Sequence, residues 1–120
     1  MPKKVVFDAN FLLLPFTLGI DVYSEIERLV EKPYHLLIPD YCLEELKKIR
    51  ETFVPAAILL LKNKGVKIMK TGLQGHADQN LSRQDKENVI CTSDKELKKS
   101  LVKKGFKVIS PRGNKKLEVR

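Results

Sequence analysis

The 120-residue sequence has few of the side chains that form disulfides, zinc sites or nucleophilic active sites. Its two cysteines, Cys42 and Cys91, lie far apart and form no CxxC pair. We therefore expect two buried, reduced thiols and neither a disulfide nor a zinc site. The two histidines, His35 and His76, are isolated. No Ser/His/Asp or Cys/His arrangement is recognisable, so hydrolysis through a serine or cysteine nucleophile is not indicated.

Long apolar runs are also missing from the sequence. No stretch approaches the roughly 20 apolar residues of a membrane-spanning helix. The opening Met-Pro-Lys-Lys lacks the pattern of a signal peptide. With 42% hydrophobic and 32% charged residues, the chain is suited to one core of ordinary size. We expect a single domain over residues 1–120, in a soluble, cytoplasmic protein without a membrane partner.

The net charge of +8 is concentrated at one end of the chain. The first 94 residues contain 13 basic and 13 acidic side chains, whereas the last 26 contain ten basic and two acidic ones. A basic segment over residues 95–120 indicates a polyanionic partner, most simply nucleic acid. The alternative is a solvated, lysine-rich helix face, and charge alone does not decide between the two.

Strand and helix signals alternate along the sequence. Apolar runs predict strands near residues 4–7, 35–38, 66–70, 89–92 and 106–110. Apolar spacing and capping residues predict helices near 20–30, 40–51, 55–65 and 94–104. This alternation favours an α/β fold with a parallel sheet and helices on both faces. The tail after Ser110 is expected to add a short edge strand or to stay loose.

Two acidic residues directly follow strands of this expected sheet. Asp8 follows the first strand and Asp94 follows the fourth. If these strands are neighbours, the two carboxylates converge at the carboxyl edge of the sheet, where ligands bind in such folds. Converging carboxylates repel each other unless a cation lies between them, and Mg²⁺ and Mn²⁺ prefer such oxygen ligands. Taken singly, however, Asp8 is compatible with a turn and Asp94 with an ordinary N-cap.

Two further acids are candidates for the same site. Glu45 lies on the flank of the apolar stripe of its helix, about a quarter-turn from its centre, while Glu44 points towards solvent. Asp78 begins the segment after the loop TGLQG and lies near an expected helix start. Each has a simpler interpretation, as a surface helix residue and a helix cap respectively. Only the combination of four acids favours a metal site.

The four acids stand in segments that together resemble the PIN-domain nucleases. VVFDANFLL is similar to the first motif of that family, IPDYCLEEL to the second, HADQNL to the third and VICTSDKELKK to the fourth. The resemblance implies a three-layer α/β/α fold with about five parallel strands in the order 3-2-1-4-5. It also implies that Asp8, Glu45, Asp78 and Asp94 are catalytic residues and ligands of Mg²⁺ or Mn²⁺. Asn10, Thr92 and Ser93 are then expected to orient the carboxylates or the attacking water.

The function implied by this resemblance is metal-dependent endonucleolytic cleavage of RNA, with a role in ribosomal RNA processing. GIDVYSEIERLV and TSDKELKKSLVKKGFKVI look most like archaeal relatives of the nuclease of the small-subunit processome. The partner is then RNA, and an antitoxin or a ribosome-assembly protein is left open. The expected RNA-binding residues are Lys95, Lys98, Lys99, Lys103, Lys104, Arg112, Lys115 and Lys116.

Three alternatives stay open at this point. A VapC-type toxin ribonuclease has the same motifs. A catalytically degenerate RNA-binding module is suggested by Gln79, where a second aspartate is common, and by the short segment 77–88. A receiver-like signalling domain also gathers carboxylates, but it requires an acidic pair that Asp8 lacks. The run AAILLL at 56–61 is apolar on every side, which favours either core burial or a homodimer through this helix.

Overall fold

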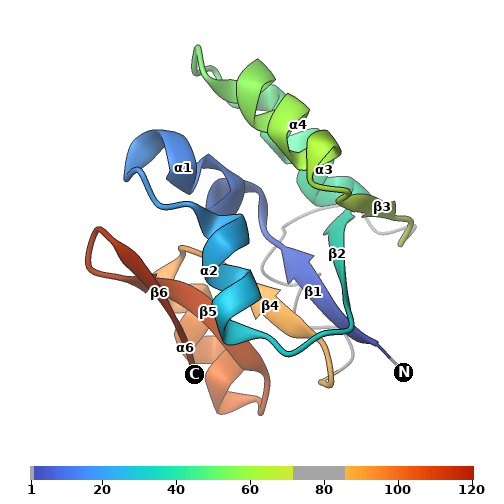
Figure 1. Cartoon of the computed structure of the whole chain (residues 1–120), viewed down its shortest axis with the longest axis vertical. Helices are drawn as coiled ribbons and strands as arrows, with labels where there is room; N and C mark the ends of the chain where they lie inside the picture. The colour runs from blue at the N-terminus through green and yellow to red at the C-terminus, as the bar shows by residue number, and fades with distance from the viewer. Residues whose placement is uncertain (1, 72–85) are drawn as a thin grey trace.

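The computed structural model describes residues 2–71 and 86–120. Its centre is one sheet of six strands in the order β3-β2-β1-β4-β5-β6 (Figure 1). The strands are β1 (Lys3–Phe7), β2 (Tyr34–Pro39), β3 (Lys67–Met69), β4 (Val89–Cys91), β5 (Lys107–Arg112) and β6 (Lys116–Val119). The helices are η1 (Ala9–Leu13), α1 (Leu14–Thr17), α2 (Val22–Leu29), α3 (Asp40–Lys48), α4 (Val54–Asn63) and α6 (Lys95–Lys103).

The first five strands run parallel in the predicted order. β1 is the central strand, paired with β2 through Val5↔Leu36 and with β4 through Val6↔Ile90. β2 pairs with β3, and β4 with β5, both in parallel. The expected count of about five strands is corrected to six, because β6 returns antiparallel to β5 after a tight turn. Gly113 has a φ of +64° in this turn, a conformation that glycine adopts without strain.

Helices cover both faces of the sheet, which confirms the three-layer architecture. Val5 and Phe7 of β1 point to the face covered by α2, α3 and α4. Val6 points to the opposite face and packs with Leu97 and Leu101 of α6. Because β1 is buried on both faces, it reads as a continuous apolar run rather than an alternating one. In the described part of the chain, no helix is long and apolar enough to cross a membrane.

Two observed elements were not predicted. The sequence from Ala9 to Leu13 forms the 3-10 helix η1 and leads into the short helix α1, in which Pro15 occupies an early position. The apolar run FLLL buries all of its side chains, so it has neither the alternation of a half-buried strand nor the stripe of a surface helix. A further feature concerns Asp40, the first polar residue after the apolar strand and a residue type that often caps helices. Pro39 holds that N-cap position, and Asp40 is the first residue of α3.

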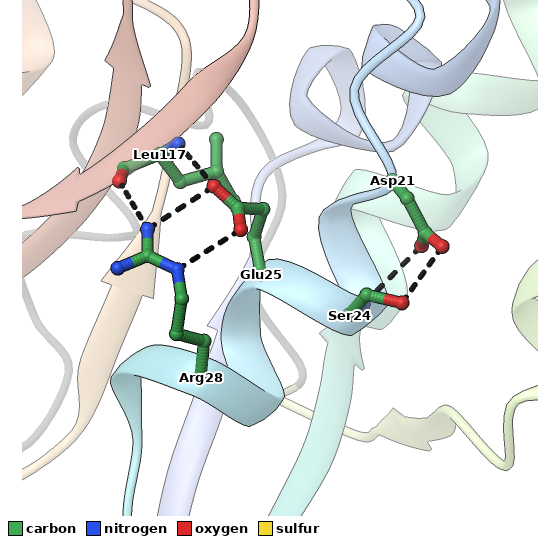
Figure 2. Close-up of polar contacts among 5 residues, drawn as sticks. All are labelled: Asp21, Ser24, Glu25, Arg28 and Leu117. Atoms are coloured by element: carbon green, nitrogen blue, oxygen red, sulfur yellow. Dashed lines mark hydrogen bonds and ion pairs between the residues drawn. The ribbon is translucent and has the colours of Figure 1, made fainter.

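The edge strand β6 is held to α2 by a polar clamp formed by Glu25 and Arg28 (Figure 2). Glu25 Oε1 accepts a hydrogen bond of 3.0 Å from the backbone N–H of Leu117, and Arg28 Nη2 donates one of 3.2 Å to the Leu117 carbonyl. Arg28 also binds both carboxylate oxygens of Glu25 at 3.1 Å. Leu117 and Pro111 form a non-hydrogen-bonded pair of the antiparallel ladder, so the backbone groups of Leu117 point away from β5 and towards the clamp.

The clamp makes stability depend on pH in the acid range. The hydrogen bond from Arg28, followed by that from Leu117, holds the pKa of Glu25 below its ordinary value of 4.5. The stabilisation is therefore complete above that value and is lost as the pH falls through the lowered pKa. In Glu25→Gln, we expect a smaller drop in Tm between neutral pH and about pH 4. The change in Tm is measured by thermal unfolding at each pH, monitored by circular dichroism.

Glu27→Gln is the matched control for this prediction, because Glu27 is exposed on the same helix and pairs with Lys32 at 3.4 Å. Its pH dependence of Tm should follow that of the wild type. If the Glu25 and Glu27 variants respond identically to acid, the clamp contributes nothing to the pH dependence.

Candidate active site

The site is built around Asp8, which directly follows β1. The backbone N–H of Asp8 donates to the Cys91 carbonyl at 2.9 Å and so continues the pairing with β4. Its side chain is only 5% exposed. Oδ1 accepts a hydrogen bond from the Ala9 N–H at 2.8 Å, and Oδ2 accepts one from Thr92 Oγ1 at 2.9 Å. These donors offset part of the cost of burying the carboxylate.

Thr92 connects Asp8 to Asp94. Thr92 follows β4 and is fully buried. Its hydroxyl donates to Asp8 and accepts a hydrogen bond of 3.1 Å from the Asp94 N–H. One side chain therefore fixes the ends of the two neighbouring strands relative to each other. The structure thus brings Asp8 and Asp94 to the same edge of the sheet.

Asp94 is exposed and also caps α6. Its Oδ1 accepts hydrogen bonds from the N–H groups of Glu96 at 2.9 Å and Leu97 at 3.1 Å. This is the N-cap that the sequence predicts, and it orients the carboxylate at the start of the helix. The capping role and a role at the site are compatible, because a carboxylate has two oxygens with several lone pairs.

Glu45 lies on α3 and is half-buried. The same helix carries the buried Cys42 one helical turn earlier. Burial raises the pKa of the Cys42 thiol, and the negative charges of Asp8 and then Glu45 raise that pKa further. Both carboxylates therefore lie within electrostatic reach of one sulfur atom. Cys42 and Cys91 are buried, free thiols, as expected from the sequence.

The remaining predicted residues differ in how they are placed. Asn10 is exposed on η1, next to the buried Ala9, and Ser93 is half-buried between Thr92 and Asp94. Asp78 and Gln79 lie outside the described residues, as does most of the segment 77–88. The described part of the predicted site is thus Asp8, Glu45 and Asp94 with their polar neighbours.

The oxygen ligands of the site are of the type that a hard divalent cation prefers, and the structure holds Asp8 and Asp94 together through Thr92. Asp8 and Asp94 provide carboxylate oxygens at one sheet edge, which are the ligands that Mg²⁺ and Mn²⁺ prefer. Within residues 2–71 and 86–120, no three acidic, histidine or cysteine side chains come close enough to hold a metal ion. The described residues therefore fit such an ion as a two-carboxylate site.

The predicted RNA-binding side chains separate into two groups. Lys95, Lys98 and Lys99 line a cleft of about 540 Å³ that begins at Ser93 and Asp94 and extends to the turn between β5 and β6. The others do not line that cleft and are exposed at the end of α6 or on the hairpin: Lys103, Lys104, Arg112, Lys115 and Lys116.

Sequence reasoning missed three polar residues near this edge. Asp40 at the end of β2 accepts hydrogen bonds from Thr71 Oγ1 at 2.7 Å and from the Thr71 N–H at 3.1 Å. Glu118 and Arg120 join the cleft region through β6. The signal available for Asp40 was its position directly after an apolar strand, the same signal that identified Asp8 and, less directly, Asp94.

Comparison with known proteins agrees with this geometry. Residues 5–114 match the PIN-like domain family. The chain belongs to the PIN-like domain family. The matched region runs from within β1 to beyond the end of β5 and includes all four predicted acids. Ribonuclease VapC4 of Methanocaldococcus jannaschii is 26% identical to this PIN-like domain over 125 residues, covering 97% of this chain and 95% of the relative.

A solved structure of the PIN domain endonuclease Utp24 shares the fold. It superposes with a TM-score of 0.82 at 22% identity, covering 99% of this chain and 92% of the other. The order 3-2-1-4-5 that the resemblance implied for a PIN-like domain is therefore the order of the first five strands here.

Proposed function

We propose that this PIN-like domain is an endoribonuclease that hydrolyses RNA phosphodiester bonds with the help of Mg²⁺ or Mn²⁺. The observation that carries the proposal is the link from Asp8 through Thr92 to Asp94 at the carboxyl edge of the parallel sheet. The similarity to Ribonuclease VapC4 over nearly the whole chain supports an RNA substrate.

The cation would be held by Asp8 and Asp94. Glu45, which does not join them in a close cluster of three, would reach it through a water molecule, and Asp78 is the fourth proposed ligand. When bound, it would supply positive charge that screens the phosphodiester and lowers the pKa of a water molecule. The protein itself contributes the positions of these groups. Thr92 holds Asp8 Oδ2 in place, and the N-cap holds Asp94. Asn10 and Ser93 are exposed or half-buried beside these acids, where they can orient a water molecule or the phosphate.

The test is cleavage of RNA by the purified protein. Structured and single-stranded RNA, each labelled at one end, are incubated with the protein in Mn²⁺, in Mg²⁺ and in EDTA. The proposal predicts defined internal cuts with either metal and none in EDTA. Intact RNA in all three conditions would favour an RNA-binding module without activity.

Thr92→Val tests the link between the two acids. The substitution removes the hydroxyl that donates to the buried Asp8 carboxylate, so Oδ2 loses one hydrogen bond. We expect cleavage to fall about 10- to 100-fold, as is common when a partner of a metal-binding group is removed. The free energy of unfolding should fall by about 1–3 kcal/mol. Initial cleavage rates and urea unfolding measure the two effects.

Thr92→Ser is the matched variant, because serine keeps the hydroxyl and removes one methyl group. It should retain most of the cleavage activity. Wild-type activity in Thr92→Val would show that the hydroxyl has no role in positioning Asp8.

For the biological role, we propose ribosomal RNA processing in the cytoplasm, and we keep a VapC-type toxin as the second candidate. The first rests on the sequence resemblance of residues 19–30 and 92–109, and the second is favoured by the similarity to VapC4. Incubation with a precursor ribosomal transcript and with unrelated RNA distinguishes them: a cut confined to the precursor supports processing.

A homodimer through α4 is also part of the proposal. The outer side of α4 carries Leu59 with 61% of its surface exposed, and Phe53 before α4 stacks with Phe16 of α1 at 5.7 Å. A single exposed leucine is ordinary on a protein surface, so the dimer proposal rests on the apolar run at 56–61 that surrounds the whole helix. Sedimentation that gives a monomer at high concentration would exclude the dimer.

A further inference from the structure

The cleft beside Asp94 has a composition suited to an anionic ligand. It is lined by the first two turns of α6, the end of α1 and the β5–β6 hairpin. Its cationic side chains are Lys95, Lys98, Lys99 and Arg120. Leu14, Leu18 and Pro111 form an apolar wall. Since the cleft begins at Asp94, a polymer bound at the two acids can continue directly into it.

One carboxylate beside the cleft binds two of these cations. Glu118 Oε1 lies 3.1 Å from Lys98 Nζ and 3.4 Å from Arg120 Nε. The side chains of Lys98 and Glu118 are only 20% and 21% exposed, so their pair is partly shielded from solvent. The hydrogen bond from Lys98 holds the pKa of Glu118 below its ordinary value, which shows that the pair favours the charged carboxylate. An anion in the cleft must therefore compete with Glu118.

A buried hydroxyl lies at the floor of the same cleft. Ser110 is directly opposite Glu118 in the β5–β6 ladder, so both side chains lie on the face covered by α6. Ser110 is 3% exposed, and its Oγ has no hydrogen-bond partner among the described residues. Buried hydroxyls normally have a partner, so this hydroxyl keeps an unused donor beside the cleft.

We propose that this cleft binds a backbone phosphate of single-stranded RNA next to the scissile phosphate, and that Glu118 limits the affinity by competing for Lys98 and Arg120. The proposal rests on the endoribonuclease function above. Lys98 and Arg120 turn from Glu118 to the phosphate, and Ser110 donates to one of its oxygens. A cleft of about 540 Å³ is comparable to small-molecule sites, which suits one extended strand rather than a duplex.

The experiment measures the affinity for RNA without cleavage. A short, fluorescently labelled single-stranded RNA is titrated with protein in EDTA at several NaCl concentrations, and anisotropy gives Kd. In Glu118→Gln, we expect Kd to fall about 3- to 10-fold in about 50 mM salt, with a steeper salt dependence because more cations meet phosphate. Glu31→Gln is the matched control. It makes the same charge change at an exposed residue between α2 and β2, and its Kd should stay within about twofold of wild type.

Removal of the cation gives the complementary result. Lys98→Gln should raise Kd about 5- to 10-fold, because Glu118 then repels the phosphate. Lys107→Gln, at the opposite end of β5, is the control and should have little effect. The double variant Lys98→Gln/Glu118→Gln has the wild-type net charge and should bind more weakly than Glu118→Gln alone. Ser110→Ala should weaken binding, about threefold.

Three outcomes would overturn the proposal. The first is an equal change of Kd in Glu118→Gln and Glu31→Gln, which would indicate net charge alone. The second is a Glu118→Gln variant that binds RNA as the wild type does but binds polyglutamate more tightly, which would indicate an acidic protein partner. The third outcome applies if Glu118→Gln does not fold. Arg120→Gln is then measured instead, because the Arg120 side chain is 64% exposed, and a Kd equal to that of the wild type would overturn the proposal.

Failure of the nuclease function has a separate signature. In that case the wild-type protein binds RNA, Glu118→Gln binds it more tightly, and neither cuts it in Mn²⁺. This result would exclude the nuclease function and support the proposed phosphate site in the cleft.

Discussion

Asp8→Asn is expected to lower the rate of RNA cleavage on the order of a thousandfold, comparable to the loss of a preorganised charge-stabilising group in other active sites. Asparagine has nearly the same shape but no charge, so the site loses one of its two linked carboxylates. The fold should survive. The asparagine oxygen can still accept from the Ala9 N–H, and the rotatable Thr92 hydroxyl can accept from the amide.

Initial rates on labelled RNA in Mn²⁺ measure this effect, and thermal unfolding checks the fold. Asp21→Asn is the control with the same chemical change, because Asp21 is an exposed residue whose carboxylate caps α2 and which is none of the four predicted acids. It should cut RNA at the wild-type rate. Cleavage by Asp8→Asn at that rate would mean that the activity comes from another site or from a contaminating nuclease.

Substitution of Asp94 separates its two roles. Asparagine is as good an N-cap as aspartate, whereas alanine removes the cap and costs about 0.5–2 kcal/mol of stability. We expect both Asp94→Asn and Asp94→Ala to lose RNA cleavage by at least about a hundredfold, because both lose the carboxylate. Only Asp94→Ala should unfold at a lower urea concentration. Urea unfolding and cleavage rates on the same preparations give the comparison.

An Asp94 that acts only as a cap would give a different pattern. Asp94→Asn would then cut RNA normally, and any loss in Asp94→Ala would follow its stability. Asp21→Ala is the control for cap removal, since it deletes the N-cap of α2, where Oδ1 accepts from the Ser24 N–H. It should lose stability and keep activity.

The sequence predicted the part of the fold that depends on local patterns. Apolar strands alternating with capped helices indicated a parallel sheet, and the resemblance to PIN domains supplied the order 3-2-1-4-5, which the first five strands confirm. The convergence of Asp8 and Asp94 followed from that order, because both residues directly follow neighbouring strands. Helical periodicity placed Glu45 on the flank of α3, where it is half-buried.

What the sequence did not reveal depends on contacts between distant residues. The sequence left open whether the tail after Ser110 forms an edge strand. β6 pairs with β5 and is held by the Glu25–Arg28 clamp, and no local pattern in the tail shows these contacts. Lys98 was predicted to bind RNA, but its partner Glu118 lies twenty residues further along the chain. Thr71, likewise, is joined to Asp40 across 31 residues. Such polar pairs have no periodicity that a single sequence can display.

The Glu25–Arg28 clamp has a consequence for association between molecules. An outermost strand with unpaired backbone groups can join the sheet of another copy and start aggregation. At the β6 edge, side chains of α2 already bind the N–H and carbonyl of Leu117, the groups through which such pairing would begin. The opposite edge, β3, is only three residues long and starts with the exposed Lys67. Side chains that bind the backbone of Leu117 thus hinder pairing of β6 with a second sheet. At β3, the short length of the strand and the charge of Lys67 hinder it.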